Sequence, residues 1–187
     1  VSDQAGRSNV MAELERAGIP FEKSDPKLTR LVEEMKEKEA AGYAYESADA
    51  SFQLLARRVL GRVPEYFRVE QFDVNVEQRY NALGERVTVA MAVVKVDVAG
   101  ERLISAAEGN GPVNALDNAL RIALGRLYPE LARLELIDYK VRILEGAHGT
   151  DARTRVLVES SDGEREWGTV GVAGLDQHPR PGVGAVR

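Results

Sequence analysis

The sequence predicts an α+β fold, in which a helical linker subdomain is followed by a domain of β-β-β-α repeats, the second of them incomplete. Apolar residues follow a helical period up to about residue 60, and from Tyr66 onward they alternate as in extended strands. A pattern of three strands begins a second time at Leu134. The 187 residues are 44% hydrophobic and 29% charged, which is ordinary for a globular protein with one or two domains.

The N-terminal part carries the signals of three helices. The first is expected to start at Ser8 or Asn9, whose side chains can accept hydrogen bonds from the free amides of a first helical turn. The second has Asp25 as its cap and Pro26 at its first position, where an amide hydrogen is not needed. The third is expected to begin near Ser47.

The first repeat is predicted to contain a long hairpin, a short strand and a helix. Its strands cover about residues 67–76, 87–98 and 102–107, with apolar residues at alternate positions. The segment Gly109-Asn110-Gly111-Pro112 then opens a helix. One apolar stripe of this helix is expected to lie on the sheet, and it consists of Val113, Leu116, Leu120, Ala123, Leu124 and Leu127.

The second repeat is predicted to lack its helix. Strands are expected at about residues 134–144, 154–159 and 166–172. The segment that follows contains Pro179, Pro181 and three glycines, which cannot sustain a helix. One face of the second sheet is therefore expected to lack its cover.

These patterns predict three parts along the chain. Residues 1–64 form the helical linker subdomain, residues 65–172 form the repeat domain, and residues 173–187 form an atypical, disordered tail. The chain begins with Val1 and not with Met, which suggests a piece of a longer protein.

Composition argues against several classes of partner. No apolar run approaches the ~20 residues that a membrane-spanning helix needs, so we expect no membrane partner. The formal charge of −5 is spread evenly along the chain and leaves no basic surface for nucleic acid. The chain has no cysteine, which excludes thiolate catalysis and fits a cytoplasmic protein.

Few residues suggest chemistry of their own. His148 and His178 are the only histidines, and neither has a second ligand at metal-binding spacing, so we expect no metal site in this chain. Arg7 and Ser8 can bind a carboxylate or phosphate, although an exposed helix entry is the simpler explanation. The segment 109–112 can aim free amides at a carboxylate, but on the residues alone a simple turn into a helix is preferred.

Four segments together resemble the C-terminal part of the 2-isopropylmalate synthase and citramalate synthase family. Residues 1–10 (VSDQAGRSNV) are similar to the segment after the catalytic barrel, and residues 42–52 (GYAYESADASF) to the helical linker of the citramalate type. Residues 108–117 (EGNGPVNALD) and 136–141 (LIDYKV) resemble the core of the allosteric dimerisation domain.

The resemblance implies a parent enzyme that condenses acetyl-CoA with a 2-keto acid, pyruvate in citramalate synthases. The reaction occurs on a divalent metal in a TIM barrel, so this chain is expected to hold no cofactor and to be inactive alone. In the intact enzyme Arg7 and Ser8, and also Tyr43 and Tyr45, are implied contributors to the active site.

The resemblance also implies a homodimer that binds the end-product amino acid. Isoleucine is expected, with the leucine of 2-isopropylmalate synthases as the alternative. The residues that match the family's pocket are Gly109, Asn110, Gly111, Pro112, Val113, Asp138 and Tyr139. A Gly111→Val change is expected to abolish binding by forcing the backbone and crowding the ligand.

An alternative of another class is a stand-alone α+β module for a ligand or RNA. The acidic balance of the chain and the absence of Lys and Arg around residues 109–120 argue against RNA.

Overall fold

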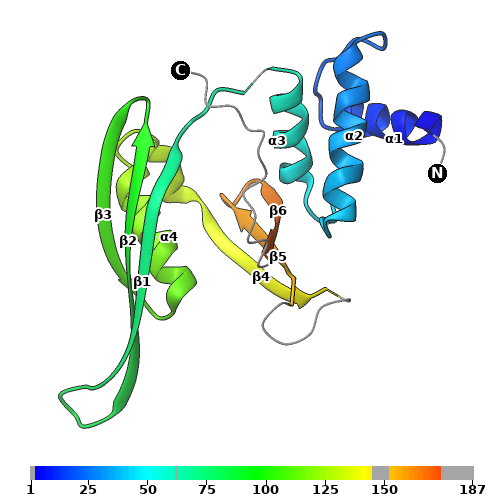
Figure 1. Cartoon of the computed structure of the whole chain (residues 1–187). Helices are drawn as coiled ribbons and strands as arrows, with labels where there is room; N and C mark the ends of the chain where they lie inside the picture. The colour runs from blue at the N-terminus through cyan, green and yellow to red at the C-terminus, as the bar shows by residue number, and fades with distance from the viewer. Residues whose placement is uncertain (1–2, 62, 145–151, 174–187) are drawn as a thin grey trace. The chain divides into compact units, whose positions relative to one another are not determined.

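The computed structural model describes residues 3–61, 63–144 and 152–173 (Figure 1). The chain divides into two compact units, Pro64–Leu134 on the one hand and Val1–Val63 with Glu135–Arg187 on the other. Compact packing does not show which parts of a chain fold independently. The predicted division into residues 1–64, 65–172 and 173–187 therefore stays a prediction. The α+β class with two three-stranded repeats is confirmed.

Three helices form the N-terminal part: α1 (Asp3–Arg16), α2 (Pro26–Ala40) and α3 (Asp49–Val59). As predicted, Asp25 caps α2 by accepting a hydrogen bond from the amide of Lys27, and Pro26 is its first residue. The predicted start of α1 is wrong, because this helix begins before Ser8. Helix α3 begins near Ser47, as predicted, with Ala48 as a cap that makes no side-chain bond.

The core of these helices is apolar and fully buried. The buried residues are Val10, Leu14, Ile19, Leu28, Leu31, Val32, Phe52, Ala56 and Leu60.

None of the described helices is long and apolar enough to cross a membrane.

The first sheet consists of β1 (Arg68–Tyr80), β2 (Arg86–Val98) and β3 (Glu101–Gly109) in an antiparallel order β1-β2-β3. Helix α4 (Pro112–Leu124) packs on β2 and β3. Alternate residues of β2, from Ala90 to Val98, are buried against it.

The predicted apolar stripe of α4 is partly wrong. The residues buried against the sheet are Ala115, Ala119, Ala123 and Leu124, whereas Val113 is 41% exposed and Leu127, just after the helix, is 47% exposed. Small alanines let the helix axis approach the sheet closely, so the larger side chains stand at the edges of the contact. Periodicity gave the helix, but it did not show which of two adjacent stripes faces inward.

The second sheet consists of β4 (Glu135–Ile143), β5 (Thr154–Ser161) and β6 (Glu166–Ala173), again antiparallel and in chain order. A short 3₁₀ helix, η1 (Pro129–Arg133), precedes it and was not predicted. Strand β4 is exposed along nearly its whole length, and Val170 of β6 is the one buried apolar residue among the described residues of this sheet. Of the predicted tail, residues 173–187, Ala173 belongs to β6, and the rest, with Pro179 and Pro181, lies outside the described residues.

Candidate functional site

The start of α4 leaves its first-turn amides without a side-chain cap. Gly111 is the capping residue and has no side chain that could accept a hydrogen bond from these amides. Pro112, which follows it, has no amide hydrogen to donate. The amides of the next residues have no acceptor inside the helix, and the positive end of the helix dipole lies at the same place. This is the arrangement that suits an anion such as a carboxylate.

Gly111 itself is not conformationally strained. Its φ of −172° is extended backbone that any residue adopts, and a Cβ added to it meets no atom within 4 Å. The expectation that valine at this position would force the backbone is therefore wrong. Gly111→Val would instead place a side chain in the open space in front of the helix start.

Gly109 is the glycine that the local packing requires. A Cβ there would lie 2.4 Å from the amide nitrogen of Ala115 and 2.7 Å from Oδ1 of Asn114. The end of β3 therefore lies directly against the first turn of α4. Glycine is needed here because it has no side chain to separate the two.

Two asparagines of α4 hold the loop between β3 and α4. Oδ1 of Asn114 accepts a hydrogen bond of 3.2 Å from the amide of Asn110, and Nδ2 of Asn118 donates one of 2.9 Å to the carbonyl of Glu108. Sequence reasoning missed both roles. Their i, i+4 spacing placed them on one face of the helix, which was the available signal.

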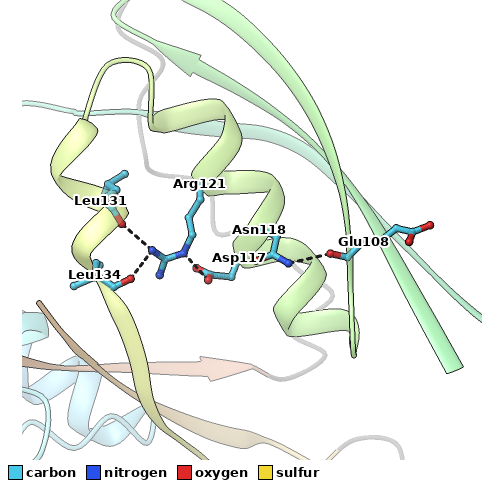
Figure 2. A network of polar contacts seen from close by, with 6 residues as sticks. All are labelled: Glu108, Asp117, Asn118, Arg121, Leu131 and Leu134. Carbon is cyan, nitrogen blue, oxygen red and sulfur yellow. Dashed lines mark hydrogen bonds and ion pairs between the residues drawn. The ribbon is translucent and has the colours of Figure 1, made fainter. Parts of the chain in front are cut away.

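The far end of α4 is tied to η1 by Arg121 (Figure 2). Its Nε donates to Asp117 at 2.7 Å, and its Nη1 donates to the carbonyls of Leu131, at 2.8 Å, and Leu134. An apolar cavity of about 470 Å³ lies beside this network and is lined in part by Tyr66, Leu120 and Tyr128. Asp117 and Arg121 already bind each other, so the network stabilises the helix and does not form a ligand site.

Asp138 and Tyr139 lie on β4, in the other compact unit from Gly109–Val113. The carboxylate of Asp138 accepts from Nζ of Lys140 and, at 2.8 Å, from the amide of Tyr139. The Lys140 hydrogen bond holds the pKa of Asp138 below its usual range. The side chain of Tyr139 is 41% exposed on this strand.

The two polar residues predicted in α1 differ in their use. Nη1 of Arg7 donates to Oγ1 of Thr29 at 3.0 Å, and Nη2 donates to the carbonyl of Lys23 at 2.7 Å. These bonds connect α1 to α2 and to the loop before it, which is a structural role. Ser8 is exposed on α1.

Tyr43 and Tyr45 lie between α2 and α3, with ring centroids 6.4 Å apart in a stacked arrangement. Tyr45 packs against the helical core, and burial raises its pKa to about 12, with the neighbouring Tyr43, Glu39 and Glu34 adding to the effect. It also lines a cavity of about 560 Å³. Charged residues of that cavity are Glu13, Arg16, Glu39, Glu46 and Asp49.

Four of those five charges are negative, so the cavity as it stands repels the phosphates of an acyl-CoA. The described residues contain no group of three or more His, Asp or Glu side chains that could hold a metal ion. His148 and His178 lie outside the described residues.

Comparison with protein families gives one match over most of the chain. The model described as the LeuA allosteric (dimerisation) domain matches residues 46–174. This range includes α3, both sheets and α4.

Curated relatives match nearly the whole chain. It is 52% identical to an (R)-citramalate synthase of Streptomyces coelicolor over 174 residues, which are 92% of this chain and 32% of that protein. It is 48% identical to the (R)-citramalate synthase of Synechocystis sp. over 93% of this chain, and 47% identical to that of Geobacter sulfurreducens over 92%, again with 32% of each relative covered. The chain thus spans about a third of the length of these relatives.

Proposed function

Because the chain belongs to the LeuA allosteric (dimerisation) domain family, we propose that it is the C-terminal regulatory region of a citramalate synthase. The resemblance to this family drawn from the sequence is confirmed by the match. Catalysis, with acetyl-CoA, pyruvate and a divalent metal, belongs in this proposal to a barrel outside this chain. The chain itself binds the end product and works in the cytoplasm.

The effector site is proposed at the start of α4. The observation that carries it is the uncapped helix start at Gly111, with open space in front of it. The carboxylate of an amino acid would accept hydrogen bonds from the amides of the first turn. Val113, 41% exposed beside these amides, offers an apolar contact for a branched side chain.

Isoleucine is the proposed effector, and calorimetric titration of the chain with isoleucine, leucine, alanine and glutamate tests it. Isoleucine should bind more tightly than alanine, because each additional buried methylene contributes about 0.8 kcal/mol. Equal weak binding of all four amino acids would contradict an apolar effector pocket.

Gly111→Val is the matched variant for the same titration. The open space at Gly111 lets the protein fold, so far-UV circular dichroism should be unchanged while isoleucine binding is lost. Leu83→Val, in an exposed turn, is the control. Full isoleucine binding by Gly111→Val would show that the pocket lies elsewhere.

Active-site contribution is proposed for Tyr45 and, less directly, for Tyr43. The tyrosines lie in the segment between α2 and α3, and the mostly negative cavity beside Tyr45 is not proposed to hold the phosphates of the acyl-CoA. Two donors of Arg7, by contrast, are engaged with Thr29 and Lys23. Arg7 is therefore proposed to keep α1 in place so that Ser8, exposed on the same helix, can reach the rest of the enzyme.

A homodimer is proposed through the face of the first sheet opposite α4. Met91, Val93 and Ile104 are 45%, 38% and 69% exposed there, and a symmetric partner would cover them. Light scattering of Ile104→Glu should show a weaker dimer than wild type, whereas Leu83→Glu in the hairpin turn should not. A wild-type monomer at high concentration would contradict the proposal.

A further inference from the structure

The segment that runs from the end of α2 into the first turn of α3, residues 41–51, is bound to the second sheet by hydrogen bonds at both of its ends. From β5 and the residue before it, Arg155 Nε donates to the carbonyl of Gly42 at 2.6 Å and Arg153 donates to that of Ala41. From the outer edge of β6, the amide of Gly168 donates to Asp49 Oδ1 at 2.9 Å. The amide of Val170 donates to Ser51 Oγ, also at 2.9 Å.

These bonds give acceptors to the amides of Gly168 and Val170 at the edge of β6. The amides on the outer side of an edge strand have no neighbouring strand to accept their hydrogen bonds, and here the side chains of Asp49 and Ser51 accept them instead. The contact between the segment and β6 therefore depends on the positions of individual donors and acceptors, unlike an apolar contact, which has no preferred direction.

Two glycines permit this close approach. A Cβ on Gly42, whose φ is +98°, would lie 2.3 Å from the side chain of Leu144. A Cβ on Gly168 would lie 2.4 Å from the carbonyl oxygen of Ser47. A side chain at Gly168 would push the sheet and the segment apart, because it meets backbone, whereas at Gly42 the left-handed φ is what disfavours a side chain.

The segment held in this way carries Tyr43 and Tyr45. We propose that Arg155, Asp49 and Gly168 are positioning residues, through which the second sheet fixes the tyrosine segment that the active site of the parent enzyme uses. This inference rests on the proposed function and adds the route by which the regulatory sheet reaches the active site.

The register of the sheet supplies a path for that influence. Asp138 of β4 pairs with Glu159 of β5, which in turn pairs with Gly168 of β6. Asp138 is one of the residues that the family resemblance assigns to the effector pocket, and Gly168 is one of the residues that bond the segment. A shift of β4 along or away from β5 therefore changes the position of the strand that holds Asp49.

The first test measures this contact in the chain without any ligand. Burial raises the pKa of Tyr45 to about 12, so release of the segment should lower this pKa toward the ordinary value of 10.0. Ultraviolet absorbance of phenolate reports it, with Tyr45→Phe identifying the signal. Trp167, the single tryptophan, lies beside Gly168 and reports the sheet side of the contact by its fluorescence.

Three substitutions separate the hydrogen bond from charge. Asp49→Ala removes the acceptor, and we expect the pKa of Tyr45 to fall and Trp167 emission to shift. Asp49→Asn removes the same charge but keeps Oδ1, so both signals should stay near wild type. Ser51→Ala removes the neighbouring bond without a change of charge and is the mild variant, expected to shift both signals partly, should Asp49→Ala not fold.

Gly168→Ala and Gly171→Ala form a matched pair within β6. The first places a Cβ against Ser47 and should act like Asp49→Ala, whereas a Cβ at Gly171 meets nothing within 4 Å and should change neither signal. An unchanged pKa of Tyr45 in both Asp49→Ala and Gly168→Ala would overturn the inference, whether or not Trp167 emission moves.

The second test asks for the effect on activity. In a chimera, this chain replaces the matching third of the Streptomyces coelicolor relative, and citramalate formation is measured with each variant. Asp49→Ala and Gly168→Ala should lower kcat about tenfold, with Asp49→Asn and Gly171→Ala near wild type. Equal kcat in all four would overturn the inference. Failure of isoleucine to bind would contradict only the proposed function, because neither test uses that ligand.

Discussion

Each sheet of this protein has a glycine on its third strand where the start of a helix comes against it, but the two helices come from different places in the chain. On β3, Gly109 faces Ala115 of α4, which follows the strand directly. On β6, Gly168 faces Ser47. The amide of Gly168 donates a hydrogen bond to Asp49 of α3, which lies 119 residues earlier in the chain. The first sheet is completed locally, and the second is completed by the linker helices.

The way in which each helix is attached differs as well. Helix α4 lies across its sheet and buries alternate residues of β2, so the attachment is mainly apolar. Helix α3 meets β6 at its edge and through polar groups, and β4 stays exposed. Apolar burial is stable and hard to reverse, whereas a few polar bonds are individually worth about 1 kcal/mol and can be exchanged with water. The second contact is therefore the better place for a change of state.

The largest difference should appear when Gly109, at the end of β3, and Gly111, at the start of α4, are changed. Gly109→Ala forces its Cβ into the backbone of α4, and we expect a loss of about 3 kcal/mol in the stability of the unit. Gly111→Ala loses part of a good helix cap but meets no atom, and should cost less than about 1 kcal/mol. Urea unfolding followed by circular dichroism checks both. Equal losses of stability in the two variants would mean that the end of β3 can move away from α4 to accommodate a side chain.

The strands and the start of α2 could be predicted from the sequence, whereas the start of α1 could not. Alternation of apolar residues predicted the six strands, and Asp25-Pro26 predicted the start of α2, because these are local signals that tertiary packing left intact. The start of α1 was wrong because the helix runs through Ser8 and Asn9, which act as caps only when the chain leaves the helix before them.

The sites depended more on long-range packing. Arg7 looked like a ligand group, but Thr29 and the carbonyl of Lys23 lie within its reach only in the folded helices. No local pattern separates Gly109, which must be glycine, from Gly111, which need not be. The bonds of Asp49 and Ser51 to β6 join residues that are 119 apart, and no local pattern of either segment contains them.

The second difference concerns matched valines in the two sheets. Val94 of β2 is 1% exposed under α4, and Val94→Ala should cost about 2 kcal/mol through lost burial and the cavity that remains. Val141 of β4 is 52% exposed, and Val141→Ala should change stability by less than about 0.5 kcal/mol. Hydrogen exchange of the amides in β2 and β5 measures each sheet separately. A large effect at Val141 would show that β4 is covered in solution.

The third difference is a loss of stability at high pH that Tyr45 produces on the linker side. Burial raises the pKa of Tyr45 to about 12, so the folded state holds the phenol proton more tightly than the unfolded chain, whose pKa is 10.0. The resulting stability is present below pH 10 and is lost as the pH rises toward 12. We expect a loss of about 1 kcal/mol, allowing for solvent screening, that is absent in Tyr45→Phe. Unfolding of both proteins at pH 9 and at pH 11.5 checks it, and parallel losses in the two would contradict it.

The smallest effect on stability is expected at Asp138, although this residue belongs to the proposed effector set. Its carboxylate bonds Lys140 on an exposed strand, and the lowered pKa means that the contribution exists above the ordinary pKa of the carboxyl and disappears as the pH falls. Exposed pairs contribute little because water screens them. Asp138→Asn should therefore leave the unfolding midpoint unchanged at neutral pH, as should Glu164→Gln in the turn between β5 and β6.

The two variants should differ only with the effector present. If the ammonium group of isoleucine contacts Asp138, Asp138→Asn should weaken calorimetric binding about tenfold, whereas Glu164→Gln should not, because both remove one negative charge but only the first removes it from the effector set. Equal affinity in wild type and Asp138→Asn would exclude Asp138 from effector binding. An unfolding midpoint that falls in Asp138→Asn alone would instead show that this ion pair stabilises β4, against the small contribution expected of an exposed pair.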